Sequence, residues 1–391
     1  MKHYFWLPVV AGCLAVFCLM LGFPLGASIP DTFTAFDAPG AGSDSGQGTS
    51  AQSLNENGEI AGHYADTKSV VHGFVRHKDG TFTSFDAPGA SQKASLGTFP
   101  RSINSSGETA GFYQTDPGGV RHAFVRHADG TFTIFDLQYS VGTVAQAIDN
   151  RGEIVGTFVV NDAVHAFIGH KDGTSTPFDP PGSYDTAPQA MNARGDIVGY
   201  YEDIRGVFCA FARYQDGRFD TFKVPEASTA EGEGTYGISI NQNGEIVGYY
   251  NKGPYHATHG FMRHADGTIT LFDPPGSIPD TAAHKDEDGY EVRPVTAPTS
   301  INEHGEIVGY YGDKAGALHA FIRQKNGAFQ TFEAPGASKI SDLGTSPMDI
   351  NGDGEIAGFY YADPDGVLHS FMMMRPPVST AEPVKVQNKA R

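Results

Sequence analysis

The sequence is short of cysteine. Its 391 residues include three, and two of these, Cys13 and Cys18, lie in the apolar stretch at the N-terminus. If that stretch is removed on export, Cys209 remains alone, and one cysteine forms no internal disulfide. The stability of the fold must then come from burial of apolar surface in a sizeable core.

Positive charge is also scarce. The chain has 27 Lys and Arg residues against 45 Asp and Glu residues, which gives a formal net charge of −18. The basic residues do not cluster, and nucleic-acid binding depends on basic side chains that neutralise phosphates. We therefore expect no nucleic-acid partner.

Long apolar runs are missing after the first 30 residues. The run at residues 4–23 follows Lys2 and His3 and precedes the small residues "GAS" at 26–28, which is the order of an export signal. We expect cleavage after Ala27, no membrane span in the mature protein, and a secreted or periplasmic location. The run is long enough to act as an uncleaved membrane anchor, which is the alternative.

The common catalytic motifs are absent too. The sequence contains no Gly-x-Ser-x-Gly elbow, no His-Glu-x-x-His and no phosphate-binding glycine loop. What it does contain is a repeat, built around the phrase "N-x-x-G-E-I". Its glycine recurs at Gly58, Gly107, Gly152, Gly195, Gly244, Gly305 and Gly354, with spacings of 49, 45, 43, 49, 61 and 49 residues. Periods of this length indicate solenoids, propellers or arrays.

Each repeat reads as four short strands. A threonine opens the first strand nine residues before the repeat glycine, "EIVGYY" is the second, and "HAFxR" is the third. The fourth, "TFTxFD", follows a "DG" turn in which glycine accepts a positive φ. Seven four-stranded antiparallel units predict an all-β fold, a seven-bladed β-propeller whose blades bury their faces against one another.

The seventh copy is incomplete. It ends at "HSFMMMRPP" without a fourth strand, whereas "DTFTAFDAPG" at residues 31–40 precedes the first complete unit. We therefore expect the N-terminal strand to complete the last blade and close the ring, which removes an exposed edge. The predicted organisation is a signal peptide at 1–27, the propeller at 28–377 and a disordered polar tail at 378–391.

The phrasing "GEIVGYY … HAFxR … DGTFTxFD" resembles the bacterial extracellular repeat proteins named HAF after that tripeptide. The resemblance covers roughly residues 31–374. It implies a secreted or envelope-associated bacterial protein and carries no catalytic residues with it. Cys209 replaces the histidine of the tripeptide in the fourth copy, which argues against a strict need for histidine there.

Loop length varies on one side of the expected propeller. The turn inside "N-x-x-G" and the "DG" turn keep their length, while the connections after the second and fourth strands do not. In a four-stranded meander the two variable connections lie on the same face, called here the variable face. Rigid strands that carry variable loops are typical of binding scaffolds.

Paired aromatic residues end the second strands and point toward the variable face. Tyrosine combines apolar area with a hydrogen-bonding tip, which suits sugar or peptide ligands. Packing between blades is the alternative for each pair. The candidate ligand-binding residues are Tyr200, Tyr201, Tyr249, Tyr250, Tyr310 and Tyr311.

Metal binding was considered in three places. The histidines of the HAF tripeptides recur in separate blades, so a packing role fits them better than a compact metal site. Asp349, Asn351 and Asp353 are spaced like the start of a calcium loop, but Tyr360 stands where the loop needs glutamate, which favours a plain turn. The remaining candidate is a divalent-cation site where the fifth unit breaks the repeat, formed by His256, His284, Asp286 and Asp288.

These features favour a non-catalytic binding or scaffold protein that recognises a glycan, a peptide or an envelope component on the variable face. We expect a monomer without a cofactor, apart from the possible cation. A propeller enzyme, such as a polysaccharide lyase or hydrolase with a site on the same face, is the alternative. A purely structural surface protein is a third.

Overall fold

The computed structural model describes residues 32–116, 118–253, 257–278, 284–285, 291–292, 294–362 and 366–375. Phe33–Met374 forms one compact unit, and the rest of the chain, Met1–Thr32 and Arg375–Arg391, is assigned to a separate unit. The predicted signal peptide and the predicted tail lie outside the described residues. No helix in the described part of the chain is long and apolar enough to cross a membrane.

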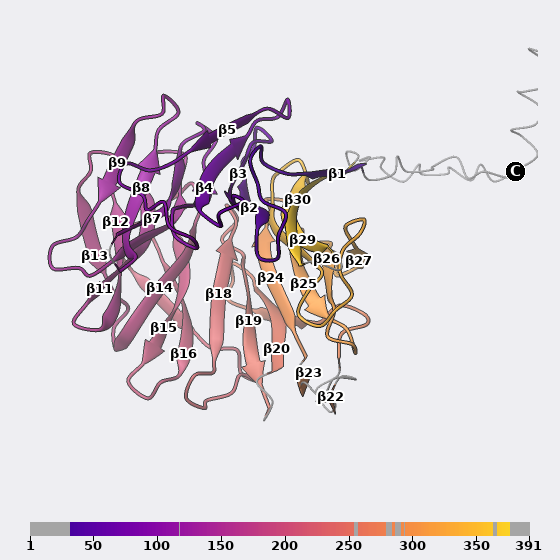
Figure 1. Ribbon diagram of the computed structural model, residues 1–391. Helices are drawn as coiled ribbons and strands as arrows, with labels where there is room; N and C mark the ends of the chain where they lie inside the picture. The colour runs from indigo at the N-terminus through magenta and orange to yellow at the C-terminus, as the bar shows by residue number, and fades with distance from the viewer. Residues whose placement is uncertain are drawn as a thin grey trace, which may run out of the picture. The chain divides into compact units, whose positions relative to one another are not determined.

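Strands dominate the compact unit (Figure 1). Five of its sheets each contain four antiparallel strands that follow one another in the chain. They comprise β6 (Thr98–Ile103), β7 (Thr109–Thr115), β8 (Val120–Arg126) and β9 (Phe132–Phe135); β10 (Thr143–Ile148), β11 (Ile154–Val160), β12 (Ala163–Gly169) and β13 (Ser175–Phe178); β14 (Ser183–Met191), β15 (Ile197–Asp203), β16 (Phe208–Arg213) and β17 (Phe219–Phe222); β18 (Thr235–Ile240), β19 (Ile246–Lys252), β20 (Ala257–Arg263) and β21 (Ile269–Phe272); and β24 (Thr296–Ile301), β25 (Ile307–Gly312), β26 (Leu318–Arg323) and β27 (Phe329–Phe332).

A sixth sheet joins the two ends of the repeat array. It contains β2 (Gly48–Leu54), β3 (Ile60–Ala65), β4 (Val71–Arg76) and β5 (Phe82–Phe85) together with β28 (Thr345–Ile350), β29 (Ile356–Ala362) and β30 (Val367–Met374). Its eighth strand, β1 (Thr32–Phe36), pairs with β30. The long insertion adds a small hairpin of β22 (His284–Lys285) and β23 (Glu291–Val292). The predicted all-β fold of four-stranded antiparallel units is therefore confirmed.

Strand β1 makes the contacts that a fourth strand makes elsewhere. The Phe33 ring stacks on Phe371 with 5.0 Å between centroids, and the Phe36 ring meets Phe74 edge-on at 6.5 Å. Phe85 of β5 meets Phe124 of the next unit in the same way, at 6.3 Å. The first residues of the compact unit thus stand in for the strand that the last repeat lacks.

The junction between β30 and β2 repeats the junctions between other units. Gly48 bridges Leu368 in parallel fashion, as Gly97 bridges Val71. Gly48 has φ 110°, and an added Cβ would collide with the carbonyl oxygen of Leu368. Only glycine allows two backbones to approach this closely.

A chain of asparagine side chains links the turns of successive units. The Nδ2 group of Asn55 donates to the carbonyl oxygen of Asn104 (2.9 Å), and that of Asn302 donates to Asn351 (3.2 Å). Asn351 in turn donates to Asn55 (3.2 Å), so the last turn bonds to the first. The same side chains cap their own turns through backbone N–H groups. The repeated "N-x-x-G-E" is therefore a structural device.

The core lies between sheets. Its largest fully buried side chains are the phenylalanines of the HAF tripeptides, Phe74, Phe124, Phe167, Phe211, Phe261, Phe321 and Phe371. Clusters around them combine residues of neighbouring units, for example Ala110 and Val125 with Ile148 and Phe167. Both faces of each sheet are buried, so one unit could not bury its apolar surface alone.

Candidate functional site

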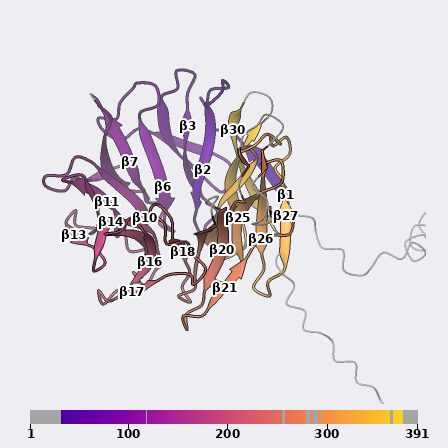
Figure 2. The same cartoon turned by 90° about the horizontal axis from the view of Figure 1, so that it is seen from below.

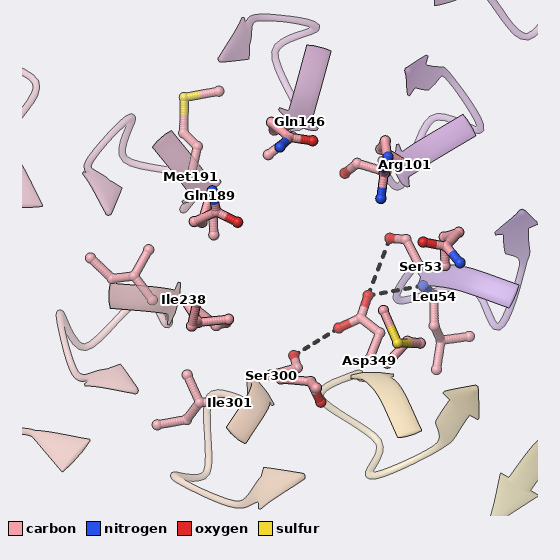
Figure 3. Close-up of a pocket in the computed structure, with 18 of the residues that line it drawn as sticks. Ser53, Leu54, Arg101, Gln146, Gln189, Met191, Ile238, Ser300, Ile301 and Asp349 are labelled. Carbon is pink, nitrogen blue, oxygen red and sulfur yellow. Dashed lines mark hydrogen bonds between the residues drawn. The ribbon is translucent and has the colours of Figure 1, made fainter. Parts of the chain in front are cut away.

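A cavity of about 370 Å³ lies where the first strands of the units approach one another. Figure 2 shows the sheets arranged around this centre, and Figure 3 shows side chains from different strands turned toward a common space. Residues of β2, β6, β10, β14, β18, β24 and β28 line it. A smaller cavity of about 140 Å³ adjoins the "N-x-x-G" turns. We call the larger cavity the axial cavity.

A β-bulge in each of these strands places one residue in the wall of the axial cavity. The pairing of β2 with β3 skips Gln52, and that of β6 with β7 skips Arg101. Bulges re-aim side chains and often lie beside functional sites. The seven bulged residues are Gln52, Arg101, Gln146, Gln189, Ile238, Thr299 and Met348. The tripeptide phenylalanine is the same in all seven units, whereas the bulged position is Gln in three units and Arg, Ile, Thr or Met in the others.

The bulged residues divide the wall into two chemical halves. Gln52, Arg101, Gln146 and Gln189 give a polar arc with one positive charge, while Ile238 and Met348 give an apolar side. Burial of the Arg101 guanidinium lowers its pKa, and the neighbouring positive charge of Arg121 lowers it further. The Arg101 side chain nevertheless keeps open surface toward the cavity.

Asp349 supplies a carboxylate to the same wall, but protein groups occupy its oxygens. It accepts hydrogen bonds from Ser300 Oγ (2.8 Å), Ser53 Oγ (3.1 Å) and the Leu54 backbone N–H (2.9 Å), as Figure 3 shows. Burial raises the pKa of Asp349, against the effect of these bonds. Asp349 thus ties three units together, and the Asn351 side chain is also hydrogen-bonded to the protein.

The six candidate tyrosines divide into two groups. Tyr250 and Tyr311 are buried and lie against the rings of His259 and His319 at 5.4 Å and 5.3 Å. Tyr201 packs with Phe211 in the corresponding cluster. These second members of the pairs lie between sheets, which is the packing alternative for them.

The first members of the pairs, Tyr200, Tyr249 and Tyr310, lie together with Tyr236 of β18. We call these four residues the tyrosine arc. The Tyr236 ring lies 4.9 Å from Tyr200 and stacks on Tyr249 at 4.7 Å. Burial raises the pKa of Tyr249, and the neighbouring hydroxyls of Tyr200 and Tyr310 add to the shift. The arc therefore spans three successive units.

Three hydroxyls of the arc form no hydrogen bond with any other described residue, those of Tyr200, Tyr249 and Tyr310. The hydroxyl of Tyr236 donates to the carbonyl oxygen of Gly232 at 3.1 Å. The side chains of Tyr200, Tyr249 and Tyr310 remain partly exposed. They present apolar faces and donor groups together, which is the combination that sugar and peptide ligands use.

The histidines of the HAF tripeptides pair with the acid that ends the fourth strand. The Nδ1 atom of His72 lies 2.9 Å from Asp86, and that of His122 lies 2.8 Å from Asp136. His369 makes the same contact with Asp37 of the N-terminal segment, at 2.9 Å. Each ring also lies against an aromatic of the second strand. These contacts agree with the packing role expected for these histidines.

Cys209 takes the histidine position of the fourth unit and is 3% exposed. The acid partner is replaced as well, because Lys223 stands fourteen residues later and lies 3.7 Å from Asp203. Burial and the neighbouring Cys209 raise the pKa of Tyr201 to about 12. In the fourth unit the buried thiol of Cys209 beside Tyr201 therefore replaces the histidine–acid pair of the other units.

We predict that Cys209→Ser lowers the free energy of unfolding by about 1–3 kcal/mol, because a hydroxyl at this site is incompletely paired. The thiol lies 3.6 Å from the carbonyl oxygen of Val207. Cys209→Val, an apolar replacement of similar size, should cost less. Denaturant unfolding checks both variants, and neither should change ligand binding. Loss of binding by a folded Cys209→Ser protein would contradict the structural role.

The predicted cation site cannot be placed. His256, Asp286 and Asp288 lie outside the described residues, and of His284 only the backbone in β22 is described. Among the residues that are described, no group of three His, Cys, Asp or Glu side chains is arranged to hold a metal ion. The site stays a prediction.

Sequence reasoning missed two residues. Tyr236 stands in a first strand at a position where the repeat offers no consistent signal, since the other units carry Ser50, Phe99, Val144, Ala187, Ala297 or Ser346. Arg101 stands at a position that is Gln in three units and a different residue in each of the others, and the sequence did not show that this position is bulged into a cavity. The surroundings of both side chains depend on contacts between separate units.

Comparison with known proteins supports the fold. No family model matches the chain, and no curated protein matches its sequence. A streptogramin B lyase structure aligns with TM-score 0.54 and 15% identity, covering 88% of this chain and 98% of that one. The virginiamycin B lyase from Staphylococcus aureus gives 0.53 and 15%, with 89% and 100% covered.

The β-propeller domain of the Trilobed protease from Pyrococcus furiosus aligns over 86% of this chain and 99% of its own, with TM-score 0.53 and 9% identity. Identities this low carry the fold and nothing of the activity. Together with the four-stranded antiparallel sheets around one axial cavity, they show that this chain has a β-propeller fold.

Proposed function

We propose that this protein is a non-catalytic binding propeller of seven blades, closed by β1, that acts outside the cytoplasm. Closure is supported by contacts that recur at the junction of the last and first units, including Gly48 with Leu368 and Asn351 with Asn55. The export signal and the HAF-repeat resemblance support a bacterial, secreted or periplasmic location. Its ligand is a glycan, a peptide or a cell-envelope component.

The tyrosine arc carries the proposal. Tyr200, Tyr249 and Tyr310 come from three units and remain partly exposed, and their hydroxyls form no hydrogen bond with other described residues. The same position is His63, Phe112, Thr157 or Phe359 in the other units. A purely structural repeat has no need for this one-sided arrangement, whereas a ligand bound off the axis does.

We predict that replacing Tyr200, Tyr249 and Tyr310 together by phenylalanine weakens ligand binding at least tenfold. Loss of two or three hydrogen bonds of about 0.5–1.5 kcal/mol each accounts for this, because the rings remain in place. The melting temperature should change little. A glycan array, followed by peptide and envelope-fraction binding assays, identifies the ligand and then compares the two proteins.

The matched control replaces the exposed Tyr139 and Tyr184 by phenylalanine, which should leave binding unchanged. Equal binding by the triple variant and the unaltered protein would overturn the proposed site. Turnover of a polysaccharide in the same screen would instead favour the enzyme alternative, a lyase or hydrolase.

A further inference from the structure

Two arginines of the second unit lie beside the same aromatic ring. The guanidinium carbon of Arg101 is 5.5 Å from the centre of the Phe112 ring, and that of Arg121 is 5.4 Å from it. The Phe112 ring is itself stacked on Phe99 at 4.9 Å with an interplanar angle of 7°. Two positive charges are therefore held close together on a rigid aromatic base.

Neither arginine has an acidic partner among the described residues, although the protein is rich in acids. Other arginines with acids in reach use them: Arg151 lies 2.7 Å from Asp149, and Arg263 lies 2.6 Å from Asp220. Like charges in a partly desolvated place repel each other, and an anion between them reverses the sign of the interaction. An anion bound beside Arg101 would offset this repulsion.

The pKa of His63 reflects both its burial and the positive charge nearby. Its ring lies 5.4 Å from Phe99, at the junction of the first two units. Burial lowers the pKa of His63 to about 4, and the nearby Arg101 charge contributes to the shift. The imidazole is consequently neutral near pH 7, which leaves the two guanidinium groups as the cations of this corner.

We propose that the axial cavity binds a small hydroxylated organic acid whose carboxylate is held by Arg101, which lines the cavity, while Arg121 lies outside the lining and adds its positive charge from beside Phe112. Arginine recognises carboxylates through paired N–H donors. The amides of Gln52, Gln146 and Gln189 match hydroxyl groups of the ligand, and Ile238 and Met348 cover its apolar side. An acidic monosaccharide has this distribution of groups.

The size of the cavity agrees with this ligand. Its volume of about 370 Å³ falls at the lower end of the range of about 300–1,000 Å³ that small-molecule sites occupy. The bulges hold the lining residues on strands, which fixes their positions better than loops would. This site is separate from the tyrosine arc and goes beyond the function proposed above.

The test measures binding of D-galacturonate, D-galactose, acetate and sulfate by calorimetry at one low ionic strength, because salt screens the interaction. We expect galacturonate to bind more tightly than the other three. Arg101→Gln should weaken its binding about 10- to 100-fold, as loss of a charge-assisted hydrogen bond predicts, and Arg121→Gln should weaken it less, because only a charge near the site is lost. Without ligand, both variants should melt at or above the temperature of the unaltered protein, because the repulsion is relieved.

Arg218→Gln is the matched control, since Arg218 lies over the Tyr214 ring at 4.4 Å on the protein surface and should not affect binding. The tyrosine triple variant should bind galacturonate normally, which separates this site from the proposed function. Failure of galacturonate to bind, binding that survives both arginine replacements, or equal binding of sulfate or acetate would overturn the proposal.

Discussion

A chain that lacks residues 28–39 should melt roughly 6 °C below the intact protein. The deletion removes β1, and with it the stacking of Phe33 on Phe371, the packing of Phe36 on Phe74 and the pairing of Asp37 with His369. Two partly buried phenylalanines and a row of strand hydrogen bonds amount to about 4 kcal/mol. For a compact unit of about 340 residues, Phe33–Met374, each kcal/mol shifts the melting temperature by about 1.4 °C.

Deletion of residues 378–391 is the matched control and should leave the melting temperature nearly unchanged. A synthetic peptide of residues 28–39 added to the shortened protein should restore much of the loss, because it can pair with β30. The same peptide with Phe33→Ala and Phe36→Ala should restore less. Calorimetric scans check all four samples, and equal small losses from the two deletions would contradict closure by β1.

Asp349→Ala should lower the free energy of unfolding by about 2–4 kcal/mol. The carboxylate accepts hydrogen bonds from Ser53, Leu54 and Ser300, so its removal leaves a backbone N–H and two hydroxyls without their acceptor. A buried donor without an acceptor costs about 1–3 kcal/mol. The bonds cross between units, so the loss weakens the junctions that hold the first, sixth and seventh repeats together.

Asp353→Ala, four residues later in the exposed turn that follows β28, is the control and should change stability by less than about 0.5 kcal/mol. Asp349→Asn separates charge from hydrogen bonding. Because burial raises the pKa of Asp349, the folded protein holds this proton more tightly than the unfolded chain. Its contribution to stability is therefore present at low pH and lost as pH rises from the unfolded pKa through the folded one, and Asp349→Asn should remove that loss.

Denaturant unfolding between pH 3 and pH 7 measures these differences. An Asp349→Ala protein as stable as Asp353→Ala would show that the carboxylate does not link the units. An Asp349→Asn protein with the same pH profile as the unaltered chain would show that the carboxyl group is not shifted.

Much of the fold could be predicted because residues close together in the sequence determine each strand and turn. Alternating apolar residues in "HAFVR", the "DG" turn and the "N-x-x-G-E" turn act within a few residues, and the repeat shows variants of the first and last seven times and the "DG" or "NG" turn six times. Even the role of β1 was readable, since the last repeat lacks the strand that the first residues supply. β1 pairs with β30, as this reading expects, and closure of the ring by β1 stays a proposal.

The candidate sites were less predictable. The sequence selected both members of each tyrosine pair, whereas the contacts place Tyr250 and Tyr311 between sheets and leave Tyr249 and Tyr310 partly exposed. In an alternating strand the two neighbours point to opposite faces, and only the position of the adjoining sheet decides which one is covered.

The sequence by itself determined the strands, the turns, the number of repeats and the histidine and phenylalanine positions that recur, because these follow from short-range geometry and internal repetition. Only the tertiary structure decided which of the residues that depart from the repeat lie close together. Gln52, Arg101 and Met348 are far apart in the chain, and bulges in separate units bring them to one cavity. Contacts between units are non-local, so no pattern within one repeat encodes them.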